Sequence, residues 1–228
     1  MAIPTSRRDS PFDIDVADDF AAVRDDWALL EAQGECTPFQ MRAWLEPWYA
    51  ILAPHFGAAP LFVRVRDAAS GAPLMLLPLA RRREGGLVVV EFADLGVSDY
   101  HAPLLASHAP ALYAHESLLW AQIEAALRPA DILRFEKAPP FVGAARNPLF
   151  DRARRHMNFC AWELRLGAGR AVFEENLPDQ AFRRELARKN RRIGGRGRVC
   201  FREETDGARL ARAFEILCAQ RAARFARL

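Results

Sequence analysis

The sequence predicts a mixed α/β fold, more closely α+β, in which helices flank a largely antiparallel sheet. Apolar and β-branched runs at residues 61–66, 74–79 and 87–92 follow one another with only short turns between them, which is typical of hairpin-linked strands. Apolar residues at three- and four-residue steps before and after these runs indicate amphipathic helices. A chain of 228 residues with 51% hydrophobic residues can bury a large core.

Two helices are expected before the first of these strands. Asp18 and Asp19 can cap a helix that runs to about Gln33 and stops at Gly34. A second helix starts near Thr37. Three aromatic side chains of this helix have the spacing of a buried face, and we interpret them as core: Phe39, Trp44 and Trp48.

Two predicted turns join the three strands, and a long loop follows them. Residues 67–71 form the first turn, and the segment Arg81–Gly86 forms the second, with Arg81–Arg83 in solvent. Residues 93–103 are mostly polar and predict a loop. The same periodicities predict helices at 112–127, 147–156, 178–193 and 206–228, and strands at 131–135, 159–166 and 198–202.

The last strand and helix predict a second, incomplete domain. One strand and one helix cannot bury their apolar faces by themselves. We therefore expect the chain to stop partway through a domain that begins near residue 166.

Composition argues against membrane, secreted and metal-binding proteins. No run approaches the roughly 20 apolar residues of a membrane-spanning helix, and the N-terminus lacks the apolar core of a signal peptide, so a cytoplasmic location is expected. Neither C-x-x-C nor H-E-x-x-H occurs, so no metal site is expected. We interpret the cysteines as buried free thiols and the histidines as surface or loop residues: Cys36, Cys160, Cys200 and Cys218, and His55, His101, His108, His115 and His156.

Positive charge is concentrated in one short segment. Residues 182–202 carry nine basic side chains and one acidic side chain, whereas residues 1–181 have a net negative charge. An anionic partner fits this segment, and Arg188 and Arg192 are its substrate-binding candidates. A solvated helix face is the structural alternative. Nucleic acid is not the expected partner, because aromatic residues are not interleaved with the arginines.

Six sequence blocks occur in an order that resembles a known family. They are TPFQMRAWLEPWY, PLFVRVRD, GAPLMLLPLARRR, GVSDYHAPLL, FRRELARKNRRIGGRGRVCF and LCAQRAARF. In order and spacing these blocks, which cover about residues 30–225, resemble the bacterial CelD-type acetyltransferases associated with cellulose biosynthesis. Those proteins belong to the GNAT superfamily of N-acetyltransferases.

The resemblance implies an acyl-CoA N-acyltransferase-like fold in tandem, with a degenerate first domain at 1–165 and the opening elements of an incomplete second domain at 166–228. It also implies transfer of an acyl group from acyl-CoA, acetyl-CoA in particular, without a metal. The acceptor would be the amine or hydroxyl of a small molecule or glycan. The alternative is a non-catalytic binding module whose basic segment 182–202 contacts an anionic partner or polyanion.

The loop GVSDYHAP carries the other substrate-binding candidates, Ser98, Asp99 and Tyr100. Asp99 can orient an amine or hydroxyl acceptor, and Tyr100 can act as general acid for a departing thiolate. A structural turn in which Asp99 accepts backbone amides is the alternative. The sequence does not identify a catalytic base.

The segment Arg191–Gly197, RRIGGRG, matches the R-x-x-G-x-G pattern by which acetyltransferases hold a pyrophosphate. In those enzymes the loop follows a strand and opens a helix, whereas here a helix is expected before it and a strand after it. Carbonyl groups at a helix C-terminus repel phosphate. We therefore interpret the match as accidental and Gly194 as a C-cap glycine with positive φ.

Overall fold

The computed structural model describes residues 10–152 and 180–226 of the chain. The chain divides into two compact units, Met1–Phe159 and Cys160–Leu228. The strand expected at 159–166 lies outside the described residues. Of the helix expected at 147–156, only the 3-10 turn η4 (Phe150–Arg152) is described.

A mixed, mostly antiparallel sheet organises the first unit, as the sequence predicts. The strand order is β1-β2-β3-β4-β6, with β1 to β4 antiparallel, β6 parallel to β4, and the short β5 antiparallel to β3. These strands are β1 (Phe12–Ala17), β2 (Ala59–Asp67), β3 (Pro73–Glu84), β4 (Leu87–Phe92), β5 (Leu104–Leu105) and β6 (Ile132–Arg134). A separate hairpin consists of β7 (Phe141–Val142) and β8 (Ala145–Arg146).

Strand β1 has no counterpart among the predicted elements. Its sequence FDIDVA alternates apolar and acidic residues, which is the two-residue period of a strand. Arg64 of β2 donates from Nε to both carboxylate oxygens of Asp15, at 3.0 Å each. The alternation was therefore the signal for this strand, and its Asp15 is paired across the ladder with Arg64.

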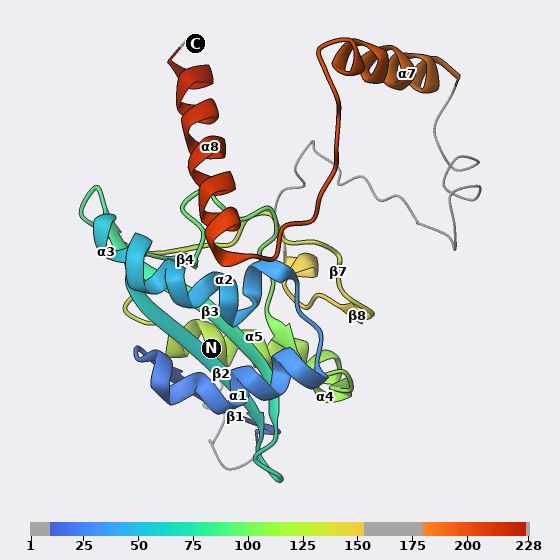
Figure 1. The fold of residues 1–228 in the computed structure, drawn as a ribbon. Helices are drawn as coiled ribbons and strands as arrows, with labels where there is room; N and C mark the ends of the chain where they lie inside the picture. The colour runs from blue at the N-terminus through green and yellow to red at the C-terminus, as the bar shows by residue number, and fades with distance from the viewer. Residues whose placement is uncertain (1–9, 153–179, 227–228) are drawn as a thin grey trace. The chain divides into compact units, whose positions relative to one another are not determined.

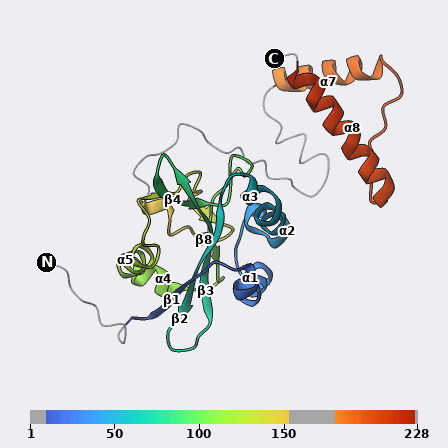
Figure 2. The ribbon, with the colours of Figure 1, turned by 90° about the vertical axis from the view of Figure 1, so that its left-hand side faces the viewer.

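Helices cover both faces of the sheet (Figure 1). Figure 2 shows α1, α2 and α3 on one side and α4 and α5 on the other. The first group comprises α1 (Phe20–Gln33), the 3-10 turn η2 (Pro38–Gln40), α2 (Arg42–Pro47), the π-helical turn η3 (Trp48–Leu52) and α3 (Ala53–His55). The second group comprises α4 (Pro110–Ala114) and α5 (Glu116–Ala126). His115 separates these two with a non-helical backbone (φ −122°, ψ 32°), so the single helix expected at 112–127 is in fact two.

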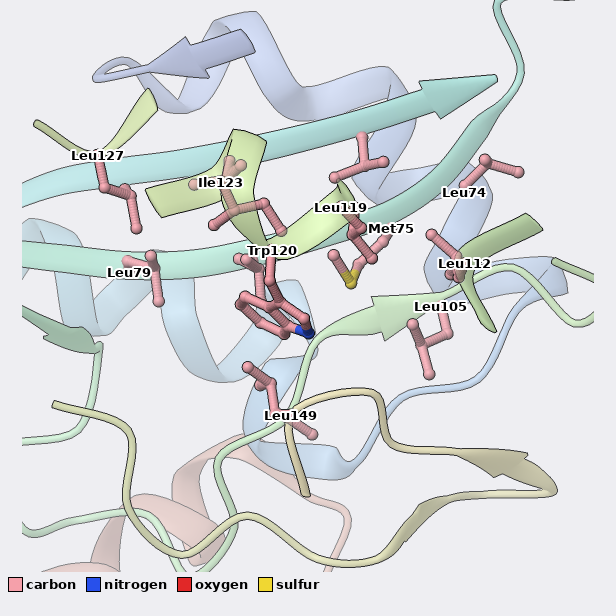
Figure 3. Close-up of a cluster of buried hydrophobic side chains, with 14 of the residues drawn as sticks. Leu74, Met75, Leu79, Leu105, Leu112, Leu119, Trp120, Ile123, Leu127 and Leu149 are labelled. Carbon is pink, nitrogen blue, oxygen red and sulfur yellow. The ribbon is translucent and has the colours of Figure 1, made fainter. Parts of the chain in front are cut away.

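Two apolar clusters lie on opposite faces of the sheet, because successive side chains of a strand point to opposite sides. On β2, Phe62 belongs to the cluster with α1 and α2, whereas Val63 belongs to the cluster with α4 and α5. Figure 3 shows Leu119 of α5 beside Met75 of β3 in the latter cluster. The central strands are thus buried between two layers of helices.

The second hairpin turn is shorter than predicted. Strand β3 continues to Glu84, which pairs with Leu87, so the turn consists only of Gly85 and Gly86. Both glycines have positive φ (57° and 88°), as a two-residue turn of type I′ requires. Arg81–Arg83 therefore lie in the strand and not in a solvated turn, because the ladder with β4 continues past them.

The described part of the second unit consists of two exposed helices. α7 (Gln180–Gly194) and α8 (Gly207–Phe225) have no buried residue. The side chain of Asp206 accepts the Arg209 amide, so the predicted cap of the last helix is confirmed. Cys200 and Cys218 are exposed, so their interpretation as buried thiols is wrong, and Cys160 lies outside the described residues.

Two further interpretations of the second unit are also wrong. Residues 198–206 form neither helix nor strand, although a strand was predicted at 198–202. A strand needs a hydrogen-bonded neighbour, and no described segment pairs with this one. Gly194 is the last helical residue of α7, and the positive φ of this segment belongs to Gly197 (141°).

Candidate functional site

The candidate site lies where the strand beside β3 is interrupted. β4 pairs with β3 up to Phe92, and β5 resumes the pairing at Leu104, so residues 93–103 leave the ladder as a loop. Pro78 of β3 lies at the interruption, and its carbonyl accepts the Ala93 amide at 3.4 Å. Because the N–H and C=O of one strand residue point to the same side, the N–H that proline lacks would have faced β4. This missing donor accounts for the departure of the loop at this point.

Side chains from η2, α2 and η3 hold the loop against the sheet. Three side chains each donate one hydrogen bond to the loop. Two of them are indoles, which are four residues apart and so lie on one helix face, and the third is an amide. The three hydrogen bonds are Trp48 Nε1 to the Asp94 carbonyl (3.0 Å), Trp44 Nε1 to Ser98 Oγ (3.2 Å) and Gln40 Nε2 to the Tyr100 carbonyl (3.0 Å). The loop is thus positioned by the fold itself.

Asp94 is the centre of the polar contacts in this loop. Its Oδ1 accepts the Ser98 amide (2.6 Å), and its Oδ2 accepts Lys137 Nζ (2.6 Å) and lies 2.9 Å from His101 Nε2. Burial of the carboxylate opposes its ionisation. The contacts with His101, Lys137 and the Ser98 amide outweigh burial and lower the pKa of Asp94 well below its usual value. Asp94 is therefore ionised at neutral pH.

His101 lies in the loop, as expected, but it is buried and not on the surface. Its side chain is 7% exposed, and its ring stacks on Phe92 with the centroids 5.2 Å apart. Its backbone amide donates to the Lys137 carbonyl at 3.1 Å. Stacking on Phe92 thus fixes the ring, and the hydrogen bond of the His101 amide fixes the backbone that carries it.

Lys137 reaches the site from the segment that follows β6. Its Nζ donates to Asp94 and, at 2.8 Å, to the Ser98 carbonyl. Since β6 is parallel to β4, the carboxyl ends of these two strands meet at one edge of the sheet. Ligand sites of α/β proteins form at this kind of edge.

The backbone is strained at two positions in this site. Leu95 (φ 52°) and Lys137 (φ 51°) are the non-glycine residues with positive φ in the part of the chain that the structure describes. This conformation is unfavourable for residues with a Cβ and is concentrated at functional sites in proteins. The strain positions Lys137 so that its ammonium reaches Asp94.

A surface hollow of about 360 Å³ opens beside the loop. Its charged lining consists of three cations and three carboxylates: Arg82, Arg134, Lys137, Glu91, Asp94 and Glu136. Arg82 Nε lies 2.6 Å from Glu91 Oε1, and Arg134 Nη1 lies 3.2 Å from Glu91 Oε2. The hydrogen bond with Glu91 raises the pKa of Arg82, so its guanidinium stays charged. His101 and its stacking partner Phe92 also line this hollow.

The predicted loop residues occupy three different environments. Ser98 is buried and accepts the hydrogen bond of Trp44. Asp99 is exposed, and Tyr100 is half-buried with its ring 6.1 Å from that of Phe39. Ser98 therefore belongs to the cluster around Asp94, but none of the three predicted residues lines the hollow. The structural-turn role considered for Asp99 is performed by Asp94.

Arg188 and Arg192 lie on the exposed helix α7 of the second unit. Arg188 Nη2 lies 2.6 Å from Glu185 Oε1, so the two side chains form an ion pair.

The interpretation of three aromatic residues as core holds for Trp48 but is wrong for Trp44, which is 39% exposed, while Phe39 is half-buried. Trp44 lies at the surface because its indole N–H donates to Ser98 in the loop and does not pack inside the core.

Sequence reasoning missed Asp94 and Lys137 as site residues, and it noted His101 as a titratable ring of the candidate loop but gave it no role. A signal was present, since Pro78 within an otherwise apolar strand indicates an interrupted or edge neighbour. Lys137 gave no comparable signal, because it reaches the site through the tertiary pairing of β6 with β4.

The described residues include no group of three or more His, Cys, Asp or Glu that could hold a metal ion. None of the helices in the described ranges is long and apolar enough to cross a bilayer. No protein-family model, curated protein or solved structure matches this chain.

Proposed function

We propose that this protein is an acyltransferase of the GNAT type, similar to the CelD-type enzymes, that transfers an acyl group from acyl-CoA to an amine or hydroxyl acceptor. The observation that supports it most is the hollow at the carboxyl ends of β4 and β6, where a fixed loop holds a buried Asp94–His101 pair. The donor would be acetyl-CoA or a related thioester, and the acceptor a small molecule or glycan.

The strand–helix–strand unit of β4, α5 and β6 supports this proposal. Its two strands are the one parallel pair among the described strands of the sheet. The pairing of β4 with β3 ends at Phe92, and the loop residues Asp94, Leu95 and Gly96 that follow line the hollow. Direct acyl transfer needs a positioned proton acceptor and donors near the thioester carbonyl, and it needs no metal.

The test is calorimetric titration of the full 228-residue chain with acetyl-CoA, followed by release of free thiol in the presence of amine and sugar acceptors. We expect a dissociation constant between about 1 μM and 1 mM, the range typical of enzyme substrates. Absence of binding at about 1 mM acetyl-CoA contradicts the proposal.

A variant that obstructs the hollow links binding to this site. Glu136 is exposed and lines the hollow, so Glu136→Trp should weaken acetyl-CoA binding by about tenfold or more, equivalent to about 1.4 kcal/mol. His108→Trp, at an exposed position outside the hollow lining, is the matched control. Equal binding by both variants would locate the donor elsewhere.

The basic helix α7 supports a second candidate function, that of a module that binds a polyanion. Its basic side chains are all exposed, and Glu185 is the one carboxylate within the helix. Arg191→Gln combined with Arg192→Gln should lower the salt concentration that elutes the chain from heparin. The slope of log affinity against log salt should fall by about one per lost contact. The control is the same pair of Arg→Gln changes at Arg212 and Arg221 of α8. Retention on heparin that does not depend on the salt concentration excludes this function.

A further inference from the structure

The ring of His101 is the least satisfied polar group of the hollow. Its Nδ1 and Nε2 are both buried and neither has a hydrogen-bond partner among the described residues, although Nε2 lies 2.9 Å from Asp94 Oδ2. Buried polar atoms in proteins nearly always have a partner. A buried imidazole nitrogen with a free position, at the wall of a hollow, therefore indicates a group that meets a ligand.

The surroundings of His101 hold the ring in place without using Nδ1. Phe92 covers one face of the ring, and the distance from Nε2 to Asp94 Oδ2 is 2.9 Å. The backbone amide of His101 is bound by the Lys137 carbonyl. Contacts of this kind are often poorly aligned in the absence of ligand and tighten when it binds.

The protonation states follow from the same contacts. Burial opposes the ionisation of Asp94, but its contacts with His101, Lys137 and the Ser98 amide lower its pKa, so this carboxylate accepts hydrogen bonds and does not take up a proton at neutral pH. An ionised carboxylate beside Nε2 favours the tautomer with its proton on Nε2. The lone pair is then on Nδ1.

We propose that His101 is the catalytic residue that transfers the proton in this site, and that Asp94 is the residue that positions it. The inference rests on the proposed acyl transfer. The acceptor gives its N–H or O–H proton to Nδ1 while its lone pair forms a bond to the thioester carbonyl carbon. The C–S bond then breaks, and the imidazolium returns the proton to the departing sulfur. No further reactant is required.

Four of the five other titratable groups at the hollow are engaged in ion pairs, and the fifth, Glu136, is exposed. The ammonium of Lys137 is bound by Asp94. Arg82 and Glu91 are paired across the strands, and Arg134 joins this pair. Tyr100, the general acid considered from the sequence, does not line the hollow.

The kinetic test compares His101→Gln with His108→Gln in the full chain, with acetyl-CoA as donor. For His101→Gln we expect kcat to fall about 10²- to 10⁴-fold. The KM for acetyl-CoA should change less than about twofold. The exposed His108 serves as the control and should leave both parameters unchanged. A His101→Gln variant that keeps the wild-type rate overturns the proposal.

Asp94→Asn tests the positioning role. An asparagine amide can donate to Nε2 and so favours the opposite tautomer, with the proton on Nδ1. We expect a fall in kcat of about 10²- to 10⁴-fold with little change in KM, as for loss of the carboxylate in other carboxylate–histidine pairs. An unchanged kcat overturns the positioning role of Asp94.

The tautomer of His101 can be measured without turnover, from the ¹⁵N shifts of the ring in wild-type protein. We expect the form protonated at Nε2. A ring protonated at Nδ1 contradicts the role of His101 whether or not the protein is active. Absence of thiol release by the wild type contradicts the acyl transfer itself, so the two failures are distinguishable.

Discussion

Helices α5 and α8 have similar apolar stripes but opposite environments. In α5, Leu119 and Ile123 are completely buried against the sheet (Figure 3). In α8, Leu217 is 51% exposed and Phe214 64% exposed. The comparison shows that an amphipathic pattern predicts a helix, whereas burial and stability depend on the surface that covers its apolar face.

Matched leucine truncations should give the largest difference between the two helices. Leu119→Ala removes a fully buried side chain and should lower the free energy of unfolding by about 3–4 kcal/mol, because it leaves a cavity. Leu217→Ala should change it by less than about 0.5 kcal/mol. Urea unfolding followed by tryptophan fluorescence measures both. A comparable loss in both variants would show that α8 packs against another part of the protein.

The second-largest difference should be in how much a carboxylate of each unit contributes to stability. Asp94→Asn leaves Lys137 without its buried partner and should cost about 2–3 kcal/mol at pH 7. Because folding lowers the pKa of Asp94, its contribution is complete above the unfolded pKa of about 4 and is lost as the pH falls further. The wild type should therefore lose stability between about pH 5 and 2 more steeply than Asp94→Asn.

The control for this effect is Glu185→Gln on α7. Arg188 lowers the pKa of Glu185 through a hydrogen bond, but the carboxylate is solvent-exposed, so water and salt screen the interaction. We expect no change in the unfolding midpoint at any pH. A pH-dependent shift with Glu185→Gln equal to that with Asp94→Asn would remove the distinction between the two regions.

Substitution of two glycines at helix ends should give the smallest difference in stability between the two units. A Cβ at Gly34, after α1, would lie 2.2 Å from the Leu105 carbonyl oxygen, so Gly34→Ala should destabilise by about 1–3 kcal/mol. A Cβ at Gly194, at the end of α7, would meet nothing within 4 Å. Gly194→Ala should increase the helical signal in circular dichroism, with a gain of up to about 1 kcal/mol in helix stability. Equal effects would indicate that backbone conformation, and not the close contact, determines the cost at Gly34.

Sequence reasoning predicted most of the first unit because its signals are local. The apolar runs of β2 and β3 and the glycines after Glu84 depend on neighbouring residues only. The cap at Asp206 is equally local. The strand predicted at 198–202 is wrong because its existence depends on a partner strand, and none of the described segments supplies one.

The candidate site was only partly predictable for the same reason. The loop that contains Ser98 was identified from its polar composition, yet the central residue is Asp94 and the buried ring is His101. These roles depend on the indoles of Trp44 and Trp48, which belong to a distant part of the sequence. Composition cannot reveal which of two neighbouring aspartates turns inward.

The sequence by itself determined the helices α1, α7 and α8, the hairpin-linked strands β2 to β4, the fold class and the concentration of positive charge on α7, because periodicity, turn chemistry and side-chain charge are properties of short segments. Tertiary structure alone decided that β6 pairs parallel to β4 and that Lys137 thereby meets Asp94. It also decided that the apolar stripe of α5 is covered, whereas that of α8 is exposed. Burial and the approach of distant charges are set by long-range packing, which no local pattern encodes.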